Sequence, residues 1–277
     1  MKFTKMQGLG NDYIYINCFE EHLERPEELS RKLSDRHFGV GADGLILIGP
    51  SKTADFKMEM YNADGSSGEM CGNGIRCVGR YVHDRGLTDQ ETITVETGAG
   101  IKTLRLHVED GKAKKATVDM GEPILEPEKI PVLGGGERFI ARSVEVGGRE
   151  WTVTCVSMGN PHAVIFVPET EALNLAEIGP LFEFHPLFPN RINTEFVKVL
   201  DGETLQMRVW ERGSGETMAC GTGACATLVA AVLNGFCKRS GTVRLLGGTL
   251  QITWDEGDNH VYMTGPAEFV FDGSIAD

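Results

Sequence analysis

The sequence contains two copies of one pattern, which limits the fold to architectures with two equivalent halves. The segment Cys71-Gly72-Asn73-Gly74 recurs as Cys220-Gly221-Thr222-Gly223, 149 positions further along. The same offset carries Gly10-Asn11 onto Gly159-Asn160. Because several matches keep one register, chance similarity within a glycine-rich chain does not explain them.

The order of the predicted elements repeats as well. After each C-G-x-G segment a helical stretch ends at a glycine, Gly86 or Gly235. Two strand-like runs follow around a glycine turn, and each half then reaches a methionine-containing strand that runs into Gly and Pro. The segment from Gly121 to Pro131 interrupts the strand pattern and predicts the boundary. The predicted domains are residues 1–120, joined by the last strand at 268–277, and residues 121–267.

The predicted fold class is α+β, with two pseudo-symmetric homologous domains, each a mostly antiparallel, curled sheet around a central helix. The pattern predicts the two central helices at 73–85 and 222–233, and two further helices at 26–33 and 175–182. The helix at 222–233 carries no charged residue, so it should be buried on all sides. It is too short to cross a bilayer.

Composition excludes several classes of protein. The 27 basic and 40 acidic residues give a net charge of −13, which argues against a nucleic-acid partner. No apolar run is long enough for a membrane span, and the first residues do not resemble a signal peptide. Seven cysteines, an odd number, indicate reduced thiols rather than a disulfide framework. We therefore expect a cytoplasmic protein with no membrane partner.

The predicted functional signal lies where the two central helices begin. Glycines there leave backbone N–H groups uncovered in the first turn, where the helix dipole favours an anion. Cys71 and Cys220 stand just before these turns, and a helix N-terminus lowers a thiol's pKa. The other five cysteines are interpreted as small buried side chains. They are Cys18, Cys77, Cys155, Cys225 and Cys237. The cysteine spacings do not fit a structural zinc site, so no metal is expected.

Two thiols on opposite sides of a carbon that bears a carboxylate are suited to stereoinversion. One thiolate removes the α-proton from one face, and the opposite thiol delivers a proton to the other. N–H donors aimed at the carboxylate would stabilise the carbanion as its charge grows. This scheme needs no cofactor, and no PLP lysine signature is evident.

The two halves differ where an unsymmetrical ligand would require it. Half one has Asn62 where half two has Glu211, followed by Arg212. Arg212 can bind a second carboxylate and Glu211 an ammonium group, although a solvated surface pair is the alternative. With Asn11, Asn160 and Asn193, these side chains suggest a ligand with an amino-acid group at each end. His162 either tunes a cysteine's pKa or is a structural histidine.

These residues resemble the diaminopimelate epimerase family over essentially the whole chain. The matching segments are F-T-K-M-Q-G-L-G-N-D-Y at 3–13, R-H-F-G-V-G-A-D-G at 36–44, N-A-D-G-S-S-G-E-M-C-G-N-G-I-R-C at 62–77, G-N-P-H at 159–162, R-I-N-T-E-F at 191–196 and E-R-G-S-G-E-T-M-A-C-G-T-G-A at 211–224.

The resemblance implies PLP-independent interconversion of LL- and meso-diaminopimelate, for lysine and peptidoglycan synthesis, by an enzyme that is commonly a homodimer. It implies Cys71 and Cys220 as the catalytic pair. From their positions beside these motifs, we also predict that His162 and Glu211 modulate a cysteine's pKa. The implied substrate contacts are Asn11, Asn62, Gly72, Asn73, Asn160, Asn193, Glu211, Arg212, Gly221 and Thr222. One departure is Gly44, where several family members carry a substrate-contacting Gln; the offset pairs this position with Asn193.

Three alternatives remain open at this stage. A proline or hydroxyproline racemase-like enzyme would share the cysteine pair, but typically has His after the first C-G and lacks the Glu-Arg pair. A non-catalytic amino-acid binding protein would use the thiols structurally. A thiol redox protein would cycle a disulfide between Cys71 and Cys220.

Overall fold

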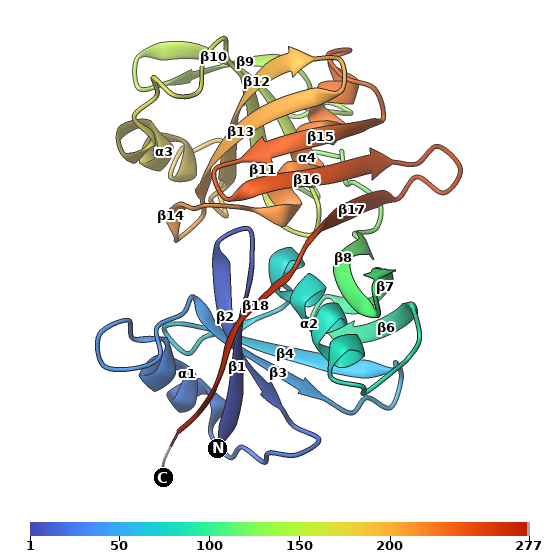
Figure 1. The fold of residues 1–277 in the computed structure, drawn as a ribbon. Coiled ribbons are helices and arrows are strands. Elements are labelled where there is room, and N and C mark those ends of the chain that lie inside the picture. Colours follow the sequence, from blue (N-terminus) through green and yellow to red (C-terminus); the bar gives the residue numbers. More distant parts are fainter. Residues whose placement is uncertain (276–277) are drawn as a thin grey trace. The chain divides into compact units, whose positions relative to one another are not determined.

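The computed structural model describes residues 1–275, which fall into two compact units (Figure 1). Unit 1 is Met1–Asp119 together with the segment that begins at Thr264, and unit 2 is Met120–Met263. The sequence placed the boundaries at 120 and 267, with the last segment joined to the first half. Residues 276 and 277 of that predicted segment lie outside the described residues.

Unit 1 is a mixed sheet with two helices. Its elements are β1 (Lys2–Gly8), β2 (Asn11–Asn17), α1 (Pro26–Ser34), β3 (Gly44–Gly49), β4 (Phe56–Asn62), β5 (Ser67–Gly68), α2 (Gly72–Asp84), β6 (Thr92–Thr97), β7 (Gly100–Glu109), β8 (Lys112–Asp119) and β18 (Glu268–Ser274). The strands pair in the order β18-β1-β2-β3-β4-β6-β7-β8. Only β2–β3 and β4–β6 in this series are parallel. In Figure 1 the last strand, in dark red, runs beside the first, in dark blue.

Unit 2 repeats this arrangement. Its elements are β9 (Arg142–Val146), β10 (Arg149–Ser157), β11 (Pro161–Phe166), α3 (Leu175–Glu183), β12 (Asn193–Asp201), β13 (Thr204–Glu211), β14 (Gly215–Glu216), α4 (Gly221–Leu233), β15 (Ser240–Leu245) and β16 (Gly248–Trp254). β17 (Val261–Pro266) carries the chain across the second boundary. The pairing order β9-β10-β11-β12-β13-β15-β16 again has two parallel pairs, β11–β12 and β13–β15.

The internal repeat extends to the register of the parallel strands. In unit 1 Tyr13 of β2 pairs with Gly44 of β3. In unit 2 His162 of β11 pairs with Asn193 of β12. Both residues of the second pair lie 149 positions after those of the first. The prediction of a mixed α+β protein made of two homologous halves is therefore confirmed.

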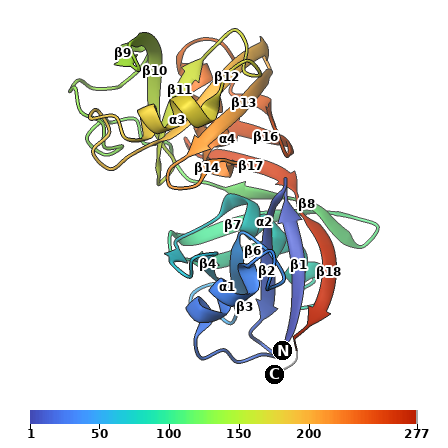
Figure 2. The same cartoon turned by 90° about the vertical axis from the view of Figure 1, so that its left-hand side faces the viewer.

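Each unit has its own central helix. In unit 1 α2 packs against β1, β2, β7 and β8 (Figure 2). Its residues Ile75, Val78 and Val82 are buried. Gly86, with φ of +71°, follows the helix as the expected left-handed residue. In unit 2 α4 packs against six strands from β10 to β16 and is buried around its whole circumference, as its uncharged sequence predicts.

No helix in residues 1–275 is both long and apolar enough to span a membrane.

The close approach of two strands at Gly44 generates a stability prediction. A Cβ added to Gly44 would lie 2.2 Å from the backbone oxygen of Tyr61 on the neighbouring strand. Gly44→Ala should therefore lower the free energy of unfolding by about 1–3 kcal/mol, because β3 and β4 must shift apart. Urea denaturation measures this value.

Gly202→Ala is the matched control, since nothing lies within 4 Å of a Cβ built there. Equal stability of the two variants would show that the strands accommodate a methyl group at Gly44.

Candidate active site

Cys71 is the N-cap residue of α2. Its backbone is extended, with φ of −126° and ψ of 118°, and its Sγ accepts the N–H of Gly74 at 3.3 Å. A Cβ at Gly74 would lie 2.6 Å from Cδ1 of Ile46, so only glycine lets the first turn sit this close to β3. The thiol is partly exposed. The predicted place of Cys71 at the beginning of a helix is confirmed.

The side chain of Asn11 contacts both Cys71 and Asn73. The Cys71 thiol donates to Oδ1 of Asn11 at 3.2 Å, and Nδ2 of Asn73 donates to the same oxygen at 3.4 Å. Nδ2 of Asn11 donates to Oδ2 of Asp43 at 2.7 Å. Because a carboxylate only accepts, Asp43 turns the Asn11 oxygen toward the thiol. Sequence reasoning gave Asp43 no role, although it stands in the A-D-G segment just before β3.

Arg76 holds the first turn of α2 in place through its hydrogen bonds. Its side chain is fully buried. Nη1 donates to the backbone oxygen of Gly72 and Nη2 to Oδ1 of Asn73, each at 3.0 Å, while Nε donates to the backbone oxygen of Pro266 at 3.2 Å. Since guanidinium is a donor only, Arg76 sets the Asn73 amide so that its NH₂ faces Asn11.

Cys220 occupies the same position in unit 2. It is the N-cap of α4, with φ of −118° and ψ of 112°, and its Sγ accepts the N–H of Gly223 at 3.3 Å. The hydroxyl of Thr222 lies 3.4 Å from the sulfur. A Cβ at Gly223 would lie 2.6 Å from Oε1 of Glu195. Unlike Cys71, Cys220 is buried.

Two carboxylates lie near Cys220, and a histidine is bonded to one of them. Nδ1 of His162 lies 2.7 Å from Oε1 of Glu195, and Nε2 lies 3.1 Å from Oδ1 of Asn160. His162 and Glu195 are both fully buried, and within residues 1–275 Oε2 of Glu195 has no hydrogen-bond partner. Glu211 accepts a hydrogen bond from the hydroxyl of Thr217. Sequence reasoning missed Glu195; the signal for it is an acidic residue inside an otherwise buried strand.

The pKa of Cys220 is raised well above the usual value of a thiol. Burial is the main cause, and the neighbouring charges of Glu211 and Glu195 add to it. Hydrogen bonds from Thr222 and Gly223 oppose the shift but are outweighed. The expectation that a helix N-terminus lowers the thiol's pKa is therefore wrong for Cys220. Burial also raises the pKa of Glu211.

Three predicted contact residues bond to nearby protein groups. Asn193 donates from Nδ2 to the backbone oxygen of Pro161 at 2.8 Å and accepts the backbone N–H of Arg212 at 2.9 Å. The exposed guanidinium of Arg212 donates to the backbone oxygen of Asn190 at 3.0 Å. Asn62 bonds to the Ser66 hydroxyl at 3.0 Å.

The structure thus assembles two groups of predicted residues. The first comprises Cys71, Gly72, Asn73 and Asn11 in unit 1. The second comprises Cys220, Gly221, Thr222, Asn160, His162 and Glu211 in unit 2. In each group a thiol stands beside first-turn N–H groups that have no carbonyl four residues earlier in the helix. This combination suits proton transfer next to a bound carboxylate.

Comparison with known proteins decides the family. The family model for diaminopimelate epimerase matches residues 3–126 and 154–270. This chain belongs to the diaminopimelate epimerase family. Among curated members named diaminopimelate epimerase, that of Acetivibrio thermocellus is 65% identical and that of Desulfovibrio desulfuricans 60% identical. The matches cover 99% of this chain in both cases, and 98% and 97% of the relatives.

Solved structures of other members of this fold are far more distant in sequence. A hydroxyproline epimerase from Agrobacterium vitis superposes with a TM-score of 0.68 at 15% identity, covering 99% of this chain and 90% of that one. A PhzF-family phenazine biosynthesis protein from Bacillus anthracis gives 0.71 at 17% identity, covering 100% and 99%. These likenesses establish the fold and carry no information on substrate.

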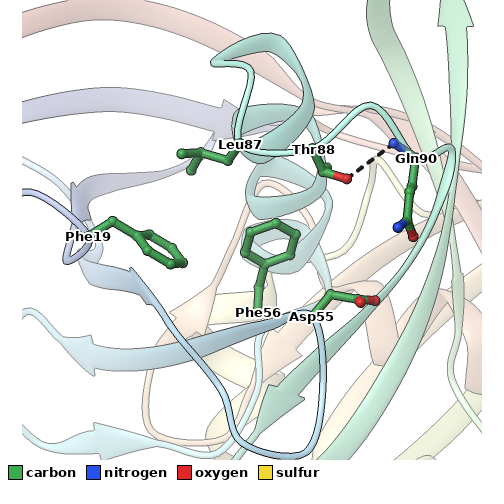
Figure 3. Close-up of a pocket in the computed structure, with 6 residues that line it drawn as sticks. All are labelled: Phe19, Asp55, Phe56, Leu87, Thr88 and Gln90. Carbon is green, nitrogen blue, oxygen red and sulfur yellow. Dashed lines mark hydrogen bonds between the residues drawn. The ribbon is translucent and has the colours of Figure 1, made fainter.

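A pocket in unit 1 is lined by six residues, none of which is a predicted site residue (Figure 3). Its volume is about 390 Å³, and it is lined by Phe19, Asp55, Phe56, Leu87, Thr88 and Gln90. Phe19 and Phe56 meet edge to face, and the Thr88 hydroxyl accepts the N–H of Gln90 at 3.1 Å. None of these residues belongs to either half-site. Across residues 1–275, no group of three or more His, Cys, Asp or Glu side chains is placed to hold a metal ion.

The raised pKa of Cys220 predicts how its reactivity depends on pH. Only the thiolate is alkylated, so iodoacetamide should modify Cys220 with a midpoint well on the alkaline side of neutral. Glu211→Gln removes one negative charge and should move this midpoint toward neutral pH. Peptide mass spectrometry across a pH series measures the modification at Cys220.

Glu169→Gln removes an equally negative, exposed side chain that bonds to Lys198 and should leave the midpoint unchanged. If Glu211→Gln also left it unchanged, the Glu211 charge would not act on this thiol.

Proposed function

We propose that this chain interconverts LL- and meso-diaminopimelate without PLP, using Cys71 and Cys220 as a paired acid and base. Family membership and the 65% and 60% identical relatives support the epimerase activity. The pathway role that accompanies this activity is the supply of lysine and peptidoglycan precursors. The observation that carries the mechanism is that both units present the same N-cap cysteine, each with its sulfur 3.3 Å from a first-turn N–H donor.

In this mechanism the two half-sites act on one α-carbon from opposite faces. The Cys71 thiolate takes the α-proton of one stereoisomer and becomes a thiol. The Cys220 thiol gives its proton to the opposite face and becomes a thiolate. The raised pKa of Cys220 supports its role as the proton donor in this direction. The reverse reaction exchanges the two roles.

The substrate carboxylate is the place where negative charge builds up in the transition state. We assign it to the N–H groups of Gly72 and Asn73 and of Gly221 and Thr222, which open the two central helices. Helix dipoles and N–H donors stabilise a developing anion most strongly where water is excluded. They lower the barrier to removing a weakly acidic α-proton without a covalent electron sink.

The remaining substrate contacts follow the asymmetry between the halves. Glu211 and Arg212 are proposed to hold the ammonium and carboxylate of the amino-acid group that does not react. Asn11, Asn62, Asn160 and Asn193 are proposed as directional contacts, and His162 as a modulator of the Cys220 pKa. Because Gly44 has no side chain, the contact made by a family Gln at this position falls to other groups.

The partners, the oligomeric state and the cellular location of the protein are proposed on separate grounds. The net charge of −13 supports a protein without a nucleic-acid partner. A homodimer is proposed from the family resemblance, and a cytoplasmic location from the odd number of cysteines, which indicates reduced thiols. Light scattering after gel filtration tests the dimer.

A proline racemase-like activity is the second candidate. This chain shares its fold with a hydroxyproline epimerase, but at 15% identity this likeness extends to the fold alone. Asn73 after the first C-G, and Glu211-Arg212 before the second, favour a substrate with two amino-acid groups. Turnover of L-proline without turnover of LL-diaminopimelate would show that the substrate is proline and not diaminopimelate.

Substitution of either cysteine tests the two-thiol mechanism. Cys71→Ala and Cys220→Ala should each lower kcat for epimerisation by about 10²–10⁴-fold, since each removes one acid/base group. Calorimetry should show that the substrate still binds. Conversion of LL- to meso-diaminopimelate is measured by chiral chromatography.

Cys237→Ala is the control, because Cys237 lies beyond the end of α4 and belongs to neither half-site. Full activity in Cys71→Ala or in Cys220→Ala would rule out paired-thiol catalysis. Lost activity together with unaltered binding would exclude the purely structural role of the thiols.

A further inference from the structure

One face of β2 is directed at the beginning of α2. Side chains two residues apart in a strand share a face, so Asn11, Tyr13 and Tyr15 line up along β2. Asn11 accepts from the Cys71 thiol at 3.2 Å, and the Tyr15 hydroxyl donates to the backbone oxygen of Gly74 at 3.3 Å. Tyr13 stands between them, so its hydroxyl is presented to the same N-cap.

The Tyr13 hydroxyl is in contact with the reactive group. The ring is buried, with 5% of the residue exposed, and the side chains of Cys71 and Asn11 are the polar neighbours that act on its hydroxyl. Burial, followed by the neighbouring Cys71, raises the pKa of Tyr13. The phenol therefore keeps its proton throughout the working pH range and remains a hydrogen-bond donor.

Gly44 makes the space that Tyr13 fills. The two residues are direct neighbours in the parallel β2–β3 pair. A Cβ at Gly44 would lie 2.9 Å from Cε1 of Tyr13. The tyrosine ring thus occupies the space beside β3 where a side chain at position 44 would begin. Several family members carry Gln at this position, and in this chain Gly44 leaves that space to the Tyr13 ring.

The internal repeat gives Tyr13 a counterpart. It lies 149 positions before His162, and both residues contact the asparagine two positions earlier, Asn11 or Asn160. Each lies in the strand that runs parallel to its neighbour in the same register, Tyr13 opposite Gly44 and His162 opposite Asn193. The surroundings differ, because Ile46 packs against Gly74 where Glu195 approaches Gly223 in unit 2. Unit 1 therefore has the neutral phenol of Tyr13 where unit 2 has the imidazole of His162 and the buried carboxylate of Glu195.

We propose that Tyr13 is a positioning residue for Cys71. The Tyr13 hydroxyl donates a hydrogen bond to the Cys71 thiolate and so favours the thiolate over the thiol. When Cys71 is a thiol, its proton is donated to Asn11. When Cys71 is a thiolate, the sulfur accepts from the Gly74 N–H and from Tyr13. Tyr13 keeps its own proton in both states. The consequence for catalysis rests on the proposed function; the effect on the thiol does not.

Other titratable groups near Cys71 are held by different partners. They are Tyr15 on β2, Asp43 before β3, and Arg76 and Cys77 on α2. Asp43 bonds to Asn11, Arg76 bonds to Asn73, and the Cys77 thiol is fully buried with a pKa raised to about 11. Removing the Tyr13 hydroxyl leaves these contacts in place, so the test isolates the contribution of this hydroxyl.

The test is the pH dependence of alkylation at Cys71 in Tyr13→Phe, without substrate. The ring and its packing on Gly44 are retained. The alkylation midpoint should move upward, and the rate at neutral pH should fall about tenfold, the size expected for one hydrogen bond to an ionised group. Peptide mass spectrometry assigns the modification to Cys71. Tyr81→Phe, which removes a hydroxyl in the last turn of α2, is the matched control and should behave as wild type.

Turnover supplies the second readout. In Tyr13→Phe the kcat for epimerisation should fall about tenfold at neutral pH, recover as the pH rises, and leave KM nearly unchanged. An unchanged alkylation midpoint in a variant with wild-type thermal unfolding would overturn the inference. A shifted midpoint in a protein without epimerase activity would sustain the inference and reject the proposed function instead.

A second experiment covers the case in which Tyr13→Phe fails to fold. Biosynthetic replacement of tyrosine by 3-fluorotyrosine makes every phenol a stronger donor. It should lower the alkylation midpoint of Cys71, and the same replacement in Tyr81→Phe should lower it equally. A midpoint that did not respond to fluorination would contradict donation by Tyr13.

Discussion

In both units a cysteine sulfur takes the place of the oxygen that usually caps a helix. Each sulfur accepts a first-turn N–H at 3.3 Å, from Gly74 or from Gly223. This bond fixes the side chain of the cap and places the sulfur beside the positive end of a helix dipole. The residue three positions later is glycine in both units, and a Cβ there would lie 2.6 Å from Ile46 on β3 or from Glu195 on β12. Glycine therefore lets the first turn of each helix approach its strand closely.

The same backbone frame carries different electrostatics in its two copies. Around Cys71 the polar groups are amides and a phenol, held in orientation by Asp43 and Arg76. Around Cys220 they include two carboxylates and a histidine, and the pKa of this thiol is raised. In the proposed mechanism, the shared backbone frame supplies two thiols for proton transfer, and the raised pKa lets Cys220 rest as the proton donor.

Most of the fold could be predicted from the sequence, because it depends on local patterns and on the internal repeat. The central helices begin at Gly72 and Gly221, one residue before the predicted 73 and 222, since the glycine after each cysteine already has helical geometry. The repeat with an offset of 149 anticipated a shared architecture, and the parallel register of Tyr13 with Gly44 and of His162 with Asn193 shows how far it extends.

The electrostatics of the site could not be predicted in the same way. The helix N-terminus argues for a lowered thiol pKa, but burial and the approach of Glu195 and Glu211 depend on tertiary packing and reverse the direction for Cys220. The roles of Asp43 and Tyr13 also depend on contacts with residues far away in the sequence.

The central claim is that two different thiols serve one carbon, and isotope transfer in heavy water tests it most directly. LL-Diaminopimelate is converted in D₂O, and both isomers are recovered at low conversion and analysed by mass spectrometry and NMR. Two thiols predict that every new meso molecule carries deuterium at the inverted centre, while the recovered LL isomer keeps its protium. Meso product that retains protium at that centre would mean that one group both removes and returns the proton, and would contradict the account.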